Sequence, residues 1–318
     1  MITIRPFNPT PGEYETVVTI YNAATPNHKR TLEMFRYMDN TADPDYLFQR
    51  EVIKRGGEII AYGFYGQFKW AYHPDKYYWE IQVPLGHPDD AAIREVYHAH
   101  LLDTLVERNP IGLSTKSAED HPHILAFLAK HGYKKILRYP YSQLNVETFD
   151  PAPFAGLAAK LQQANIDIVT LTNLQKTDPD WMRKHYELSW KIRKDVPSPD
   201  PVAEETFEQF SLVFANPDLM PDCWFVAVHE GRYVGESKLF RNPAHPERLD
   251  TGLTGVVREY RRKGIATTLK VRAIEVARQV GAKVIETDNE ENNPMYQINL
   301  QLGFQPIPAS IDFEKSLV

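Results

Sequence analysis

The residues best suited to chemistry lie in a basic turn. The run Arg258-Glu-Tyr-Arg-Arg-Lys263 carries four positive charges and one negative charge, and Gly264-Ile-Ala266 follows it. A helix that begins here points the free N–H groups of its first turn at one spot, where its dipole favours an anion. Gly264 and Ala266 are small enough for a phosphate to approach the backbone. The pattern predicts a phosphate or diphosphate site, and the alternative is a solvated basic turn.

Two elements must position this turn. Residues 249–257, rich in threonine and valine, predict a strand that leads into it. Residues 264–280 predict a helix that ends at Gly281. One face of this helix is apolar: Ile265, Leu269, Ala273, Val276, Ala277 and Val280.

A second helix begins shortly afterwards. Residues 284–287 predict a short strand, Asn293 is a good N-cap, and Pro294 is a good first helical residue. The helix 294–302 is expected to bury Met295, Ile298 and Leu302. Tyr296 and Asn299 are three residues apart and should share its other face.

These motifs together resemble the GNAT superfamily of acyl-CoA-dependent N-acyltransferases. Arg261-x-x-Gly264-x-Ala266 matches its Gln/Arg-x-x-Gly-x-Gly/Ala signature, and the loop with Asn293 and Leu302-Gly-Phe304 matches its second motif. The resemblance implies a mixed α/β fold. The expected architecture is two tandem GNAT-like domains, each with a twisted, splayed mixed sheet flanked by helices.

The resemblance also implies acetyl-CoA as co-substrate, without a metal. Its pantetheine arm would pair with the strand backbone near the turn, and its pyrophosphate would lie on N–H groups of residues 262–267. The residues implied in binding are Gly255, Val256, Val257, Arg258, Arg261, Arg262, Lys263, Gly264, Ile265, Ala266, Thr267, Asn293 and Asn299.

The family chemistry is direct attack of an amine on the thioester, which requires a neutral amine. Glu236, on the strand expected beside the signature strand, is the first candidate base, and Asp250 is the second. The alternatives are solvated strand carboxylates, or catalysis by water and positioning alone. Thr251 and Thr254 are expected to line the acceptor pocket.

The family often uses a tyrosine to protonate the leaving thiolate. Asn299 occupies that position here, and an amide cannot supply a proton at neutral pH. Tyr296, one turn earlier, either substitutes for the missing tyrosine or packs. Asn299 could still donate a hydrogen bond to the sulfur.

The chain repeats this order of elements loosely, which favours an ancient duplication. Both halves contain a strand–glycine-turn–strand unit, around Gly57 and around Gly231. The expected domains are residues 1–150 and 166–318, with a linker at 151–165 that includes a short helix. Before the glycine turns, helices are predicted at residues 13–21 and 44–54 in the first half, and at 179–193 and 203–215 in the second.

The first half lacks the basic turn. Asp89 and Asp90 stand there and would repel a diphosphate, with Asp90 aligned to Gly264. The first domain is therefore expected to be degenerate. Metal binding by His98, His121 or His123 is weighed against ordinary surface or core histidines. A dense set of aromatic residues there either packs or forms an acceptor pocket.

Composition narrows the class of protein. The chain has 318 residues, a net charge of −6 and a single cysteine, Cys223, which is expected to pack on a strand. No apolar leader or membrane-length apolar run is present, so we expect a cytoplasmic protein that binds neither membranes nor nucleic acid. The predicted function is N-acetyl transfer to a small-molecule amine by a monomer or homodimer. The rivals are a non-catalytic CoA sensor and a peptide N-acetyltransferase.

Overall fold

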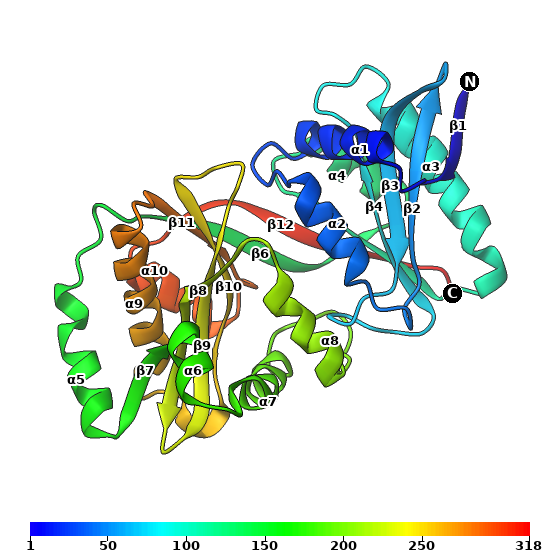
Figure 1. Ribbon diagram of the computed structural model, residues 1–318. Coiled ribbons are helices and arrows are strands. Elements are labelled where there is room, and N and C mark those ends of the chain that lie inside the picture. The colour runs from blue at the N-terminus through cyan, green and yellow to red at the C-terminus, as the bar shows by residue number, and fades with distance from the viewer. The chain divides into compact units, whose positions relative to one another are not determined.

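The structure is a computed structural model that describes residues 1–318, and it consists of two compact units (Figure 1). Unit 1 comprises Met1–Arg138, Ser198–Ala203 and Ser310–Val318. Unit 2 comprises Tyr139–Pro197 and Glu204–Ala309. Neither unit is one continuous stretch of chain.

Unit 1 is built on a mixed sheet with the strand order β1-β2-β3-β4-β5-β12. All neighbours are antiparallel except β4 and β5, which pair in parallel over only three residues. The strands are β1 (Ile2–Pro6), β2 (Phe48–Arg55), β3 (Glu58–Gly66), β4 (Lys76–Gln82), β5 (Gly112–Ala118) and β12 (Gln305–Ser316). The helices are α1 (Pro11–Ala24), α2 (Leu32–Asn40), α3 (Asp90–Leu105), η1 (Val106–Arg108) and α4 (Pro122–Lys130).

Unit 2 repeats this plan with the strand order β6-β11-β10-β9-β8-β7, in which only β10 and β11 are parallel. Its strands are β6 (Lys134–Asn145), β7 (Ile166–Thr170), β8 (Leu219–His229), β9 (Arg232–Arg241), β10 (Arg248–Val256) and β11 (Val284–Asp288). Its helices are η2 (Ala152–Phe154), α5 (Ala155–Gln163), α6 (Leu171–Thr177), α7 (Trp181–Arg193), α8 (Phe207–Ser211), η3 (Leu212–Ala215), η4 (Arg258–Tyr260), α9 (Ile265–Gln279) and α10 (Pro294–Gln301). The predicted mixed α/β class is confirmed.

The final strand of each half belongs to the other unit's sheet. β6 closes the first half, yet its residues Tyr141–Asn145 pair with β11. β12 closes the second half, yet its residues Ser310–Ser316 pair with β5. The expected linker, 151–165, also differs from a free connection, because α5 contacts β7 and α9 within unit 2.

The helix predicted at residues 44–54 is wrong, because residues 48–54 belong to β2 and residues 44–47 form a turn before it. Within this strand Arg50 is 7% exposed and pairs with Asp39. Pairing with β1 and β3 on both sides overrides the local helical pattern. The missed helix is α2, whose N-cap Thr31 accepts a hydrogen bond from the Met34 N–H.

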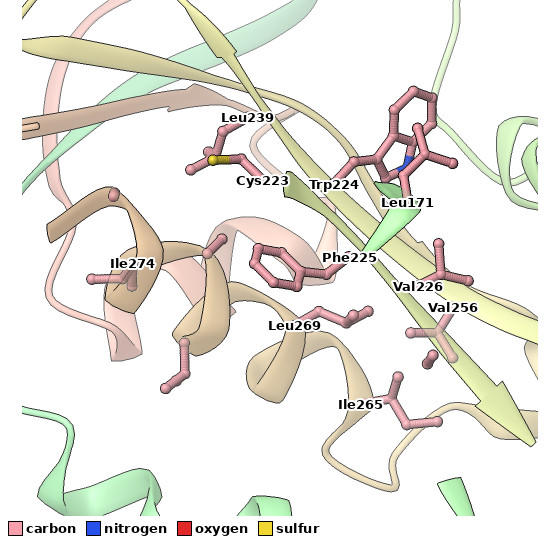
Figure 2. Packing of buried hydrophobic residues seen from close by; sticks show 14 of the residues in the cluster. Leu171, Cys223, Trp224, Phe225, Val226, Leu239, Val256, Ile265, Leu269 and Ile274 are labelled. Atoms are coloured by element: carbon pink, nitrogen blue, oxygen red, sulfur yellow. The ribbon is translucent and has the colours of Figure 1, made fainter. Parts of the chain in front are cut away.

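The core of unit 2 lies between its sheet and the helices on both faces (Figure 2). Figure 2 shows Trp224 beside Leu171 on one face of the strands and Phe225 beside Leu269 on the other. Full burial of a side chain such as Leu269 contributes about 1.5–3 kcal/mol. Cys223 packs in this core and burial raises the pKa of its thiol to about 11. Val280 departs from the predicted apolar face, because it follows the helix end and is 54% exposed.

Candidate active site in unit 2

The sheet of unit 2 opens between β10 and β11. The two strands pair only from Arg248 to Asp250, whereas β10 continues to Val256. Against β9, the register of β10 shifts between Thr251 and Thr254, so β10 carries one extra residue there. From Thr251 onward the β11 side of β10 is an unpaired strand edge, which is the feature a backbone-pairing ligand arm requires.

The turn after β10 presents an uninterrupted row of backbone donors. The N–H groups of residues 262–267 have no hydrogen-bond acceptor within the chain. Arg262 has φ 62° and Gly264, the N-cap of α9, has φ 85°. A Cβ added to Gly264 would lie 3.1 Å from Leu157 of α5. The predicted anion site therefore has the expected geometry: free donors on a tight turn at the start of a fifteen-residue helix.

The first two arginines of the turn brace it. Arg258 and Arg261 both pair with Asp195, which follows α7. The Nε group of Arg261 also donates to the Val256 carbonyl at 2.9 Å. Arg262 and Lys263 are exposed and have no acidic partner, so their charge faces solvent where a diphosphate would approach.

Glu236, the first candidate base, lies on the face of β9 opposite to α9. It is fully buried and accepts hydrogen bonds from His185 Nε2 at 2.9 Å and Trp224 Nε1 at 2.8 Å. Burial raises its pKa, but the nearby charges of Lys238 and His185, together with the hydrogen bonds from His185 and Trp224, lower the pKa to about 2. A carboxylate held ionised in this way is a weak base, so its placement favours an electrostatic role.

Asp250, the second candidate, lies at the last paired position of β10 and β11. Its carboxylate contacts Arg248 Nε at 2.9 Å and accepts a hydrogen bond from Asn242 Nδ2 at 2.8 Å. Arg248 also pairs with Glu286 of β11 at 3.1 Å. Asp250 is 38% exposed at its side chain, so it keeps access to solvent at the point where the strands part.

Asn299 is the most buried residue of α10, at 1% exposure, and the prediction that it faces away from the core is wrong. The reason is a polar contact, since its Nδ2 group donates to Asn289 Oδ1 at 2.6 Å. Asn293 caps the helix as predicted, with its side chain accepting from the Met295 N–H at 3.0 Å. Tyr296 is half-buried and its hydroxyl makes no hydrogen bond within the chain.

Of the predicted acceptor-pocket residues, Thr254 hydrogen-bonds Ser237 at 2.9 Å, and Thr251 lines a small cavity against α9. Lys270 of α9 also lines this cavity, and the sequence reading missed it. A signal was present: Lys270, Ala273, Ile274 and Ala277 are spaced as one buried helix face, which places a lysine among apolar residues.

In the corresponding turn of unit 1, most backbone N–H groups are already hydrogen-bonded within the unit. Pro84 and Pro88 have no N–H, while the N–H groups of Leu85, His87, Asp89 and Asp90 are all hydrogen-bonded within the unit. The N-cap of α3 is Asp89, so the N-caps align Gly264 with Asp89 rather than with Asp90. Asp89 pairs with Arg55, and Asp90 with Arg94.

The histidines of unit 1 are spread over separate contacts. His98 is 2% exposed, its ring centre lies 4.3 Å from that of His131, and burial lowers its pKa to about 4. His121 and His123 lie at the start of α4. No three His, Cys, Asp or Glu side chains of the chain converge in a way that could hold a metal ion.

Residues 182–304 match the model of the acetyltransferase (GNAT) family, so the chain carries a GNAT acetyltransferase domain that includes the whole turn. No curated protein matches the chain. None of its helices is both long enough and apolar enough to cross a membrane.

Solved structures share the fold of the whole chain. A tandem GNAT protein from the clavulanic acid biosynthesis pathway is 18% identical, with 99% of this chain and 98% of that chain covered and a TM-score of 0.74. A GCN5-related N-acetyltransferase from Sphaerobacter thermophilus is 15% identical over 99% and 95% of the two chains, with a TM-score of 0.68. A glucosamine N-acetyltransferase region of a fungal multi-domain GH3 β-N-acetylglucosaminidase is 12% identical, with 98% of this chain and 38% of that chain covered and a TM-score of 0.69. The tandem, two-unit GNAT fold is thereby confirmed.

Proposed function

We propose that the protein is an acetyl-CoA-dependent N-acetyltransferase that acts on the primary amine of a small molecule, with its active site in unit 2. The observation that carries the proposal is the row of six free N–H groups at residues 262–267, at the end of the open strand edge. This turn would hold the pyrophosphate, with Arg262 and Lys263 adding charge. The edge of β10 beyond Thr251 would pair with the pantetheine arm.

The chain's own groups suit direct transfer. The amine nitrogen attacks the thioester carbonyl, and a free N–H on the β10 edge would stabilise the oxyanion that develops. Asp250, which keeps contact with solvent beside the opening, is the carboxylate better placed to accept the amine's proton. Glu236 would act from the opposite face by holding a fixed negative charge near the acceptor ammonium.

Two solved structures with the same fold support the proposal of a small-molecule acceptor. One solved structure is a tandem GNAT protein from the clavulanic acid biosynthesis pathway, and another is a glucosamine N-acetyltransferase region. A test panel should therefore contain amino sugars, amino acids, polyamines and short peptides. Release of free CoA thiol from acetyl-CoA should depend on one small amine class and fall to the hydrolytic background without acceptor. Transfer to peptides alone would contradict the small-molecule acceptor.

A second function is favoured by one observation, the replacement of the family tyrosine by Asn299, whose amide is held by Asn289. A CoA sensor would bind acetyl-CoA at the same turn without transferring the acetyl group. Calorimetric binding of acetyl-CoA by a chain that acetylates nothing in the panel would favour the sensor. Multiple turnovers with any amine would exclude it.

A further inference from the structure

Lys270 is a buried cation that the nucleotide-binding turn does not use. It lies on the sheet-facing side of α9, and only 4% of it is exposed. Its side chain makes no hydrogen bond and no ion pair within the chain, and its ammonium lies 5.6 Å from the centre of the Phe304 ring. Burying an ammonium without a hydrogen-bond acceptor is costly, so the position needs a reason beyond packing.

The Lys270 side chain lines a small cavity beneath the opened part of the sheet. The cavity is also lined by Ser237 of β9, Thr251 of β10 and Ile285 of β11. It has room for roughly one water molecule. Thr251 is the first β10 residue beyond the last β10–β11 pair, so Lys270 lies where the two strands separate.

The surroundings of Lys270 lower the pKa of its ammonium group. Burial lowers the pKa of Lys270 to about 8, while the charge of Asp288 on β11 acts in the opposite direction. Ser237 and Thr251 face the cavity from β9 and β10 as neutral hydroxyls, and Phe304 faces it with its ring. A group that titrates near the working pH can both give up and regain a proton in each turnover.

We propose that Lys270 donates the proton that neutralises the CoA thiolate during acetyl transfer, an inference that rests on the proposed function. The amine nitrogen forms a bond to the thioester carbon, and the C–S bond then breaks with its electron pair moving to sulfur. The Lys270 ammonium gives its proton to that sulfur. The proton that the attacking nitrogen loses passes through Asp250 to solvent, and a proton from solvent restores the Lys270 ammonium, so that amine and acetyl-CoA become amide and CoA thiol.

The other candidates near the opening are less suited to this step. Asn299 has no proton to release at neutral pH, and its Nδ2 group already donates to Asn289. Tyr296 is half-buried on α10 and does not line the cavity. Lys270 alone combines a labile proton with a place in that cavity.

The first test compares K270M and K270R with the wild type, using whichever amine the panel identifies. Arginine keeps the charge but cannot release its proton at neutral pH, so both variants should lower kcat about 100-fold. KM for acetyl-CoA should change by less than about threefold. The wild-type kcat should fall above pH 8, and both variants should lose that limb. K283M, at an exposed lysine in the turn after α9, is the matched control.

A second measurement does not need the acceptor. Calorimetry of CoA binding at pH 7, in buffers with different ionisation enthalpies, counts the protons released. A bound thiol beside the Lys270 ammonium should release part of a proton in the wild type and none in K270M. Desulfo-CoA should release none in either chain.

The outcomes separate the two proposals. A K270R variant with wild-type kcat, or equal proton release by wild type and K270M, would overturn the role of Lys270 and leave the acetyltransferase proposal standing. A folded wild type that binds acetyl-CoA but acetylates no amine would overturn the proposed function itself. Circular dichroism on each variant establishes that it is folded.

Discussion

The two units contain the same fold with two different turns before their long helices. In unit 2, residues 262–267 leave six consecutive N–H groups free. In unit 1, the matching residues 87–92 leave only the N–H groups of Ala91 and Ala92 free, because Pro88 has none and those of His87, Asp89 and Asp90 are bonded. In both units the fold places a helix N-terminus after this turn. Whether an anion can bind there depends on how many backbone N–H groups of the turn are left without an acceptor.

The two units also differ in the residue that they bury on the strands after their glycine turns, β9 and β3. Five residues after its turn glycine, β9 places Glu236 in a fully buried ionic cluster. Five residues after its own turn glycine, β3 places Tyr62, which is 2% exposed. Unit 2 has therefore kept costly buried charge where unit 1 has an aromatic core residue, and buried charge is often retained for function.

The largest effect should come from G264D. A carboxylate at this N-cap opposes the pyrophosphate, and the left-handed φ adds strain, so acetyl-CoA affinity should fall at least about 100-fold. Calorimetry on the wild type should give one acetyl-CoA per chain. G264N, which tolerates the left-handed backbone without the charge, should retain more affinity than G264D.

The matched change in unit 1 is A92D, on the first turn of α3. It should alter acetyl-CoA affinity by less than about twofold, because that helix start has no ligand to repel. Equal losses in G264D and A92D, or two molecules bound per wild-type chain, would contradict the difference between the turns.

The next largest effect should be on stability. E236Q leaves Lys238 buried without its counter-charge and should cost about 3 kcal/mol in urea unfolding at pH 7. The folded pKa of Glu236, about 2, lies below its ordinary value of 4.5. The stability it contributes is therefore complete above pH 4.5 and lost as the pH falls towards 2.

The matched control in unit 1 is Y62F, which should change the free energy of unfolding by less than about 1 kcal/mol. Equal losses of stability in E236Q and Y62F would show that the two positions are equivalent.

A smaller effect of opposite sign is expected for K270M. The pKa of Lys270 is lowered from 10.5 to about 8, so below pH 8 the folded chain must hold a buried ammonium. Wild-type stability should rise between pH 8 and 10.5, because the unfolded chain binds more protons in that range. K270M should lack this rise and be about 2 kcal/mol more stable at pH 7. A less stable K270M would mean that the amine has a binding partner in the folded chain.

The smallest effect should come from D90N in unit 1. It weakens the 2.8 Å contact with Arg94 and should cost about 0.5 kcal/mol in thermal unfolding. Removing this charge should not create a second acetyl-CoA site, because the turn donors remain bonded. Two acetyl-CoA molecules bound per D90N chain would show that the charge of Asp90 alone prevents binding in unit 1.

Local signals predicted the C-terminal part of the fold well. A strand, a glycine-containing turn and an amphipathic helix place β10 and α9 within one residue of their observed bounds at both ends. The Asn293 cap and Pro294 start α10 at the predicted residue. These features depend on neighbouring residues in the chain, so they are readable from sequence.

Features that depend on contacts between residues far apart in the sequence could not be predicted from the sequence. The segment 44–54 was predicted as a helix, whereas most of it forms β2, in which tertiary contacts bury Arg50 and Glu51. The burial of Asn299 depends on Asn289, and that of Glu236 on His185 of α7. The spacing of Lys270 with Ala273, Ile274 and Ala277 indicated a buried helix face, but only the packed sheet shows that this face lines a cavity.

The last strand of each half has a consequence for how the chain is made. Unit 1 is completed only by Ser310–Val318, which follow all residues of unit 2 in the chain and add β12 to its sheet. Its strand β5 therefore keeps an unpaired edge until Ser310–Ser316 have been synthesised, whereas unit 2 needs no residue beyond Ala309. Synthesis should thus finish unit 2 first, and a nascent chain stalled near residue 309 would present β5 as an aggregation-prone edge for chaperones.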